Sequence, residues 1–334
     1  MAATALVPER LDRFMARANA IYYASHDPFA DFTTSPEISQ VFGEIIGLWA
    51  AVTWQLLGSP TPVVLAEAGP GRGTLMADAL RAIRGVAPDF AAALRVHLIE
   101  TSPRLRSVQA AGIPGATWHD DLGTVPDEPL ILLANEFLDA LPIRQFVRRG
   151  DGWTERFVAG GEWTEQPADP DDVPTGRATG EGDIVELNEA SRAFVGAVAA
   201  RVNRQTGAAL FLDYGPRSSA AGDSLQALAD KRPVNPLTVA GSADLTAHVD
   251  FADLAAIARA RGAAVQGPDT QGAFLSALGL FQRTERLARS QPAKAPELAQ
   301  AAKRLADPEA MGHLFKVLAL RSPAAPGLPG LQSP

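Results

Sequence analysis

The sequence predicts an α/β fold in which helices cover both faces of a largely parallel β-sheet. Short apolar runs alternate with helix-like segments along most of the chain. These runs are almost continuously apolar, as expected for parallel strands that are buried on both faces. Polar or acidic residues follow several of the runs, at the carboxyl ends where open α/β sheets bind their ligands.

The first predicted helix begins at Ser35-Pro36-Glu37 and runs to about Leu57. Ser35 provides a capping hydroxyl, Pro36 suits the first helical position, and Glu37 places an acid in the first turn. Gly58-Ser59-Pro60 ends the helix. Further strands are expected at 62–69, 95–100, 129–136, 208–215, 263–267 and 314–321, and further helices at 74–84, 103–111, 189–204 and 251–261.

Two segments interrupt this alternation. A hairpin with its turn at Gly150-Asp151-Gly152 precedes a polar loop over 165–183. A long connection over 216–247 follows the next strand, and connections of this length often act as lids. We therefore predict a helical N-terminal cap over 1–60 and a core over 61–321. The core carries insertions at about 143–183 and 216–250, and a disordered tail follows at 322–334.

Composition limits the classes of function. The chain has 334 residues, 46% of them hydrophobic, which is enough for a full core. The net charge of -8 argues against a nucleic-acid partner, because phosphate binding needs clustered Lys and Arg. The absence of Cys excludes disulfides, thiolate zinc sites and a Cys nucleophile, and the five His are too scattered to predict a metal site.

The N-terminal segment and the most apolar helix argue against a membrane location. The N-terminal segment carries Glu9 and Asp12 and lacks the continuous apolar core of a secretory signal. The apolar stretch over 41–57 contains Glu44 and Gln55 and is too short to span a bilayer. We expect no membrane insertion and a cytoplasmic location in a bacterial cell.

Glycines alternate with other residues at Gly69, Gly71 and Gly73, between an apolar run and a helix. The spacing departs from the dinucleotide fingerprint, which needs a glycine at the position of Thr74. Glu67, just before the loop, would repel a pyrophosphate but attract a ligand that carries an ammonium and a sulfonium. S-adenosylmethionine (SAM) is such a ligand, and we predict that it binds here.

Polar side chains also end the neighbouring strands. Glu100 is placed to bind ribose hydroxyls, as NAD and SAM sites both require, and Asp120 or Asp121 to accept a hydrogen bond from an adenine amino group. Asn135-Glu136 and Asp213 end two further strands. Any one of these acids can also be explained as a residue that solvates a loop, but four strand ends in a row favour a binding site.

Five segments together resemble a known family. In order along the chain they are DFTTSPEISQVFGE (31–44), EAGPGRGTLMADALR (67–81), NEFLDALPIRQF (135–146), LDYG (212–215) and ADLTAHVDF (243–251). They resemble the MidA-type SAM-dependent methyltransferases, a family that includes a mitochondrial complex I assembly factor that dimethylates an arginine. The similarity covers nearly the whole chain, and NEFLDALP and TSPEISQVFGE are highly specific.

The resemblance implies a Rossmann-like, seven-stranded class I methyltransferase sheet with an N-terminal helical lid. It implies that SAM lies along the loop from Gly69 to Thr74 and near Asn135, with Glu100 on the ribose. The segment around Thr34, Ser35 and Pro36 is then expected to fold over the cofactor, although Ala30 stands where the family usually has Gly. The implied substrate is a protein arginine, and the implication extends to a respiratory-complex subunit. A homodimer is a candidate assembly.

Carboxylates are the expected catalytic groups for a guanidinium substrate, because they can grip it with bidentate hydrogen bonds. We rank Glu136 first, followed by Asp213 and Asp139, and Asp139 has a helix-capping role as its alternative. His248 is a candidate base, although a structural histidine bonded to loop backbone is the stronger alternative, and Tyr214 has similar standing.

Two other functions are weighed against methyl transfer. An NAD-type oxidoreductase would use a similar fold, but Thr74, Glu67 and the lack of an obvious hydride-site set of His, Asp and Arg disfavour it. A non-catalytic assembly or scaffold protein could retain a SAM site without transferring a methyl group.

Overall fold

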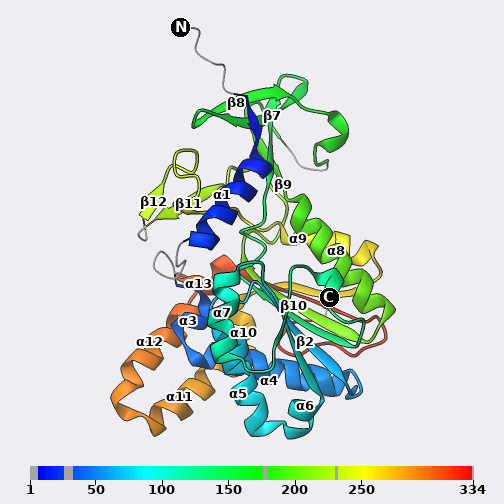
Figure 1. The fold of residues 1–334 in the computed structure, drawn as a ribbon, viewed down its shortest axis with the longest axis vertical. Coiled ribbons are helices and arrows are strands. Elements are labelled where there is room, and N and C mark those ends of the chain that lie inside the picture. The colour runs from blue at the N-terminus through cyan, green and yellow to red at the C-terminus, as the bar shows by residue number, and fades with distance from the viewer. Residues whose placement is uncertain (1–6, 26–32, 176–178, 230–231, 333–334) are drawn as a thin grey trace. The chain divides into compact units, whose positions relative to one another are not determined.

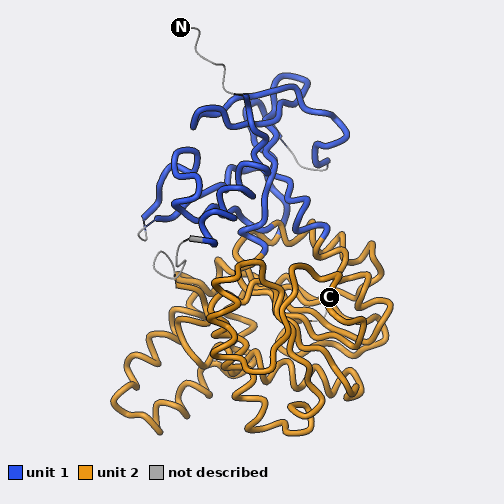
Figure 2. The backbone as a smooth tube through the Cα atoms, in the orientation of Figure 1, with its two compact units in different colours: residues 1–32, 138–193, 218–249 blue, residues 33–137, 194–217, 250–334 orange. Residues whose placement is uncertain are grey.

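The computed structural model describes residues 7–25, 33–175, 179–229 and 232–332, and these residues form two compact units (Figure 2). Unit 1 comprises residues 1–32, 138–193 and 218–249, and unit 2 comprises residues 33–137, 194–217 and 250–334. Among the described residues, no helix has the length and apolar character needed to cross a membrane.

Unit 2 contains a seven-stranded sheet that is parallel except for one strand. The strands, in spatial order, are β14 (Ala264–Thr270), β15 (Phe315–Arg321), β10 (Gly207–Tyr214), β5 (Leu130–Asn135), β2 (Val63–Ala68), β3 (Leu94–Ile99) and β4 (Thr117–His119). Only β15 among them runs antiparallel to its neighbours. The predicted fold class is therefore confirmed, and the carboxyl ends of β2, β3, β4, β5 and β10 lie at one edge.

Helices cover both faces of this sheet (Figure 1). The helices with residues in unit 2 are α3 (Ser35–Ile38), α4 (Gln40–Leu56), α5 (Thr74–Val86), α6 (Pro88–Ala93), α7 (Pro103–Gly112), α8 (Glu189–Arg204, which begins in unit 1), α9 (Phe251–Ala260), α10 (Gln271–Ala277), α11 (Leu280–Ser290), α12 (Ala295–Ala306) and α13 (Met311–Leu314), with 3-10 turns at Leu122–Thr124 and Pro292–Lys294.

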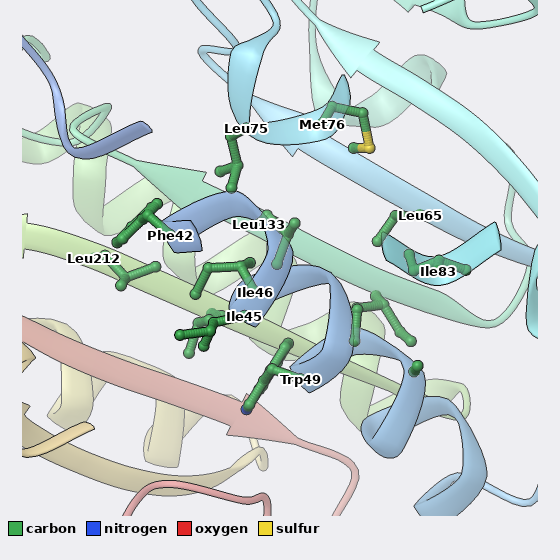
Figure 3. Packing of buried hydrophobic residues seen from close by; sticks show 14 of the residues in the cluster. Phe42, Ile45, Ile46, Trp49, Leu65, Leu75, Met76, Ile83, Leu133 and Leu212 are labelled. Carbon is green, nitrogen blue, oxygen red and sulfur yellow. The ribbon is translucent and has the colours of Figure 1, made fainter. Parts of the chain in front are cut away.

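The core between the sheet and α4 is formed by alternate strand residues. Leu65, Leu133 and Leu212 come from three neighbouring strands and pack with Ile46 and Trp49 of α4 (Figure 3). The strand residues between them, such as those at positions 64 and 132, are fully buried as well. Both sets are apolar because the sheet is covered on both faces, which explains the continuous apolar runs in the sequence.

Two glycines let α4 lie directly against α5. A Cβ atom at Gly43 would come within 2.6 Å of the Asp78 Cβ, and one at Gly47 within 2.6 Å of the Ala79 carbonyl oxygen. Residues 40–56 therefore belong to the core of unit 2 and not to a separate cap. The grouping consequently differs from the boundary expected at residue 60, because only residues 1–32 of that segment join unit 1.

The single helix predicted from Ser35 to Leu57 is divided into α3 and α4. Ser39 adopts an extended conformation (φ -157°, ψ 131°) and caps α4 by accepting a hydrogen bond from the Val41 N–H. Thr34, not Ser35, is the residue that precedes α3. The capping signal at 35–37 thus starts only one helical turn, and a second serine starts the long helix.

Unit 1 is built from two small sheets and helix α1 (Leu11–Ser25). One sheet has the order β1-β7-β6-β9, with β8 paired to β7, and the other has the order β12-β11-β13. The strands are β1 (Glu9–Arg10), β6 (Arg144–Arg149), β7 (Gly152–Ala159), β8 (Glu162–Pro167), β9 (Ile184–Leu187), β11 (Gln226–Ala229), β12 (Arg232–Val234) and β13 (Asp244–Thr246), with a 3-10 turn at Pro170–Asp172. Leu11, Met15, Ile143 and Leu245 belong to its core.

Two segments expected to be loops contain strands. The first residues of the loop predicted over 165–183 complete β8, and the connection over 216–247 contains β11, β12 and β13. The mostly polar residues at 162–167 hid β8, because a strand with a single apolar residue, Trp163, lacks an alternating apolar signal. The hairpin itself is present, with Arg149 paired to Gly152 across Gly150 and Asp151.

The segment predicted to be a disordered tail is packed as far as Gln332. Leu328 is 3% exposed, and its N–H donates to the Gln266 Oε1 at 2.6 Å. Leu331 is also buried. Two leucines spaced among Pro and Gly are enough to attach the segment to β14, although they give no periodic pattern.

Candidate cofactor-binding site

The glycine loop joins β2 to α5 and consists of Gly69 to Gly73. Gly69, Gly71 and Gly73 have positive φ angles of 65°, 56° and 83°, a region that glycine occupies without strain. Packing also excludes side chains at two of these positions. A Cβ atom at Gly69 would lie 2.7 Å from the Phe137 ring, and one at Gly73 would lie 2.8 Å from the Ile113 Cδ1. The protein itself thus requires two of the three glycines.

Glu67 is the second-last residue of β2, separated from the loop by one residue. Its side chain is buried, and its Oε2 makes no hydrogen bond with any described residue. Burial raises the pKa of this carboxyl to about 8, with a hydrogen bond from the Met76 backbone acting in the opposite direction. A buried carboxylate oxygen without a donor is well suited to a cationic ligand.

Glu100 follows β3, as predicted, and its carboxylate is held by the protein on both oxygens. The Ser102 N–H donates to Oε1 at 2.8 Å, and the Gln109 Nε2 donates to Oε2 at 3.2 Å. Burial raises the pKa of Glu100, while these hydrogen bonds act to lower it. The carboxylate therefore has a defined orientation without a ligand.

Asp120 and Asp121 follow β4, and both have partners within unit 2. Asp120 is exposed and pairs with the Arg106 guanidinium at 2.6 Å. The Asp121 Oδ1 accepts from the Thr124 N–H at 3.1 Å and so caps the following 3-10 turn. A role toward adenine remains a prediction for these two residues.

Glu136 follows β5 and has a strained backbone. Its φ angle is +50°, which is uncommon outside glycine. Its Oε1 accepts from the Ser35 N–H at 2.7 Å and from the Asn135 Nδ2 at 3.1 Å. Burial raises the pKa of Glu136, and these two hydrogen bonds oppose the rise. Backbone strain of this kind clusters at functional sites, because the surrounding structure must maintain it.

Asp213 supports the Glu136 turn from the neighbouring strand β10. It is 1% exposed, and its Oδ2 accepts from the Phe137 N–H at 3.1 Å while its Oδ1 accepts from the Tyr214 N–H at 2.9 Å. These bonds give Asp213 a positioning role for the segment that carries Glu136. The Oδ1 of Asn135, in contrast, has no partner among the described residues.

Helix α3 connects two parts of the predicted site within unit 2. Ser35 and Pro36 are buried, and the Ser35 N–H binds Glu136 as described. The Glu37 carboxylate accepts from the Thr74 hydroxyl at the start of α5. The N-terminal cap predicted over 1–60 lies partly outside the described residues, which begin again at Thr33.

Two predicted catalytic residues, Asp139 and His248, belong to unit 1. Asp139 is buried. Burial raises the pKa of the Tyr23 hydroxyl, and the charges of Asp244 and Asp139 raise it further. Asp139 lies in a turn, so the helix-capping alternative does not apply. His248 is exposed, and its backbone N–H donates to the Ser224 Oγ at 2.8 Å.

Comparison with known proteins identifies the family. A family of S-adenosyl-L-methionine-dependent methyltransferases matches residues 45–269, which is more than half of the chain. The chain belongs to this family. Its resemblance to MidA-type methyltransferases is thereby confirmed, and the NAD-type oxidoreductase is set aside.

Relatives of this methyltransferase match over most of their length. Protein arginine methyltransferase NDUFAF7 homolog, mitochondrial, of Drosophila melanogaster is 34% identical over 355 residues, covering 94% of this chain and 80% of that protein. Protein arginine methyltransferase NDUFAF7, mitochondrial, of Homo sapiens is 32% identical over 340 residues, covering 90% of this chain and 76% of that protein.

Solved structures agree with the fold. A crystal structure from Burkholderia thailandensis bound to S-adenosyl-homocysteine is 25% identical, with a TM-score of 0.78 over 98% of this chain and 92% of that chain. A native crystal structure from the same organism is 26% identical, with a TM-score of 0.81 over 97% of this chain and 89% of that chain. SAM is the cofactor of this methyltransferase.

The residues around the glycine loop fit SAM. The unpartnered Glu67 Oε2 could accept from the ammonium group, and the preset Glu100 carboxylate could accept from ribose hydroxyls. When bound, SAM supplies an electrophilic methyl group. These residues would hold and orient it, because a buried carboxylate favours a cationic ligand over a phosphate.

Sequence reasoning missed Gln109, Glu37 and Phe137. Gln109 is fully buried, and it lies on a predicted helix that has few apolar residues, so a buried glutamine was the available signal. Glu37 was explained as a first-turn acid, although its carboxylate binds Thr74. Phe137 gave no signal, because its contact with Gly69 exists only after β5 and β2 pair.

Proposed function

We propose that this methyltransferase modifies an arginine side chain of a protein substrate and that Glu136 grips the guanidinium. The observation that carries the proposal is the strained, half-buried carboxylate at the end of β5. The names of the relatives, protein arginine methyltransferases, support the substrate class.

Glu136 is suited to a guanidinium because its own environment leaves it under-solvated. Burial raises the pKa of Glu136, so the ionised form gains strongly when a cation arrives. A guanidinium stays charged at neutral pH and offers paired N–H donors. The transfer forms an N–C bond, breaks the methyl C–S bond and releases one guanidinium proton. Glu136 and the backbone that positions it orient the attacking nitrogen.

Incubation with methyl-labelled SAM and a bacterial lysate tests the proposal. Mass spectrometry of hydrolysed labelled protein should find methylarginine. Label found only in methyl-lysine or in base-labile esters would contradict it. Cofactor binding without any transfer to protein would favour the non-catalytic scaffold.

A subunit of a respiratory complex is the first candidate substrate, and a homodimer the first candidate assembly. The candidate substrate rests on the family resemblance. The substrate is tested by methylation of a purified respiratory complex, and the assembly by light scattering of the purified methyltransferase. The cytoplasmic location is likewise a proposal.

A further inference from the structure

We propose that Gln109 is a positioning residue that sets cofactor affinity by holding the glycine loop and Glu100 in one arrangement. The inference rests on the proposed placement of the SAM ribose at Glu100. It concerns a residue on α7, which follows β3 in the chain and which none of the sequence motifs includes.

The Gln109 side chain makes three hydrogen bonds in a buried position. Its Nε2 donates to the Gly71 carbonyl oxygen at 2.7 Å and to the Glu100 Oε2 at 3.2 Å. Its Oε1 accepts from the Trp118 Nε1 at 2.8 Å. One amide thus joins the glycine loop after β2, the carboxylate after β3 and a residue of β4.

The partners leave only one orientation for the amide. An indole N–H can only donate, so the amide oxygen must face Trp118. The two remaining partners, Gly71 and Glu100, offer only oxygen acceptors, and each receives one of the two N–H groups. No other side chain of similar length provides two donors and one acceptor in this plane.

This orientation prepares the site for the cofactor. The Gln109 and Ser102 bonds occupy the two oxygens of Glu100 and keep its carboxylate in one plane before a ribose arrives. The bond to Gly71 holds the loop residue whose backbone the cofactor would approach. Preorganisation of this kind raises affinity, because the ligand does not have to order the site.

The packing of α7 against the loop reinforces the same arrangement. A Cβ atom at Gly73 would lie 3.4 Å from the Gln109 Cγ and 2.8 Å from the Ile113 Cδ1. The space that a side chain at residue 73 would need is therefore filled by α7. The loop glycine and the glutamine form one contact surface.

Gln109→Glu tests the donors without changing size. Near neutral pH the new carboxylate would face the Gly71 carbonyl and the Glu100 carboxylate without a proton to donate. We expect the dissociation constant of S-adenosyl-homocysteine, measured by isothermal titration, to rise about 10-fold or more relative to the parent near pH 8. The ratio should shrink near pH 5.5, because a protonated glutamic acid donates again.

Gln266→Glu is the matched control. Gln266 is also buried and also bonds to backbone, at Leu328, but it lies on β14 at the opposite edge of the sheet. The melting temperature of the Gln266→Glu variant should fall, while its affinity for S-adenosyl-homocysteine stays within about 2-fold of the parent. Equal losses of affinity in both variants, or parent affinity for Gln109→Glu at each pH, would overturn the proposal.

Glu100→Ala provides a second arm, because alanine offers the Gln109 Nε2 no acceptor. It should weaken binding, and Gln109→Leu should then cost less affinity than it costs in the parent, because the two residues share one bond. Fully multiplicative losses would show that Gln109 does not act through Glu100. These readouts are affinities for S-adenosyl-homocysteine and one melting temperature, so failure of the arginine proposal would leave them unchanged.

Discussion

The ends of β2 and β5 place the same residue type in two different environments. Glu67 is buried and Glu136 is half-buried, and burial raises the pKa of each. Glu67 lies within a regular strand, and one of its oxygens has no partner among the described residues. Glu136 lies just past the strand with a φ angle of +50°, and its Oε1 is held by two N–H groups. The first arrangement offers a carboxyl that a cation can ionise, and the second offers a fixed direction.

We expect this difference to separate binding from transfer. A buried carboxyl on unstrained backbone can bind a cationic cofactor, and lose its proton on doing so, at no conformational cost. A carboxylate that is held in a strained conformation is expected where geometry determines a rate. Substitutions at the two strand ends should therefore affect different measurements.

The largest effect is expected for Glu136→Gln. Methyl transfer should fall on the order of 100-fold or more, because the neutral amide cannot stabilise the guanidinium during attack. Binding of S-adenosyl-homocysteine should stay within about 2-fold of the parent. Transfer of labelled methyl groups and isothermal titration measure the two quantities. A variant that loses affinity and rate together would remove the distinction between the strand ends.

A smaller effect, confined to binding, is expected for Glu67→Gln. Affinity for SAM should fall about 10-fold, because the buried carboxylate no longer meets the ammonium group. In the parent, a cationic ligand should lower the pKa of Glu67 and release a proton near neutral pH. Titration in two buffers with different ionisation enthalpies detects that proton, and the variant should release less.

The same variant should change how stability depends on pH. The Glu67 pKa is about 8 in the folded protein and 4.5 ordinarily, so both states hold the proton at low pH. Between these values the unfolded chain ionises first, and the free energy of unfolding should fall as pH rises. Glu67→Gln should remove this slope in urea unfolding curves. An unchanged slope would mean that other groups cause it.

The last comparison concerns stability alone, at two glycines with the same backbone angle. Gly58 and Gly73 both have φ angles of 83°, but a Cβ atom at Gly58 would meet nothing within 4 Å. Gly58→Ala should cost about 1–2 kcal/mol of stability from backbone strain alone. Gly73→Ala should cost about 1–3 kcal/mol more because of the contact with Ile113. Equal melting temperatures would show that α7 can move away from the loop.

Local patterns determined much of the fold. The apolar runs that became β2, β5 and β10 are continuous because both faces of the sheet are covered, and the prediction from them is confirmed. The break at Ser39 was missed, since the capping signals at Ser35 and Ser39 lie within one helical turn of each other. Strand β8 was missed because Trp163 is its one apolar residue, and a single residue gives no alternation.

By itself, the sequence determined the strand order along the chain, the glycine loop and the acids at the strand ends, because each is a local pattern of residue types. Only the tertiary structure decided why Gly69 and Gly73 cannot carry side chains, and which amide holds Glu100. Phe137 lies 68 positions from Gly69, and Ile113 lies 40 positions from Gly73. Gln109 lies 9 positions from Glu100. These contacts exist only once neighbouring strands have paired and α7 has packed against the loop, and no spacing along a single chain encodes that approach.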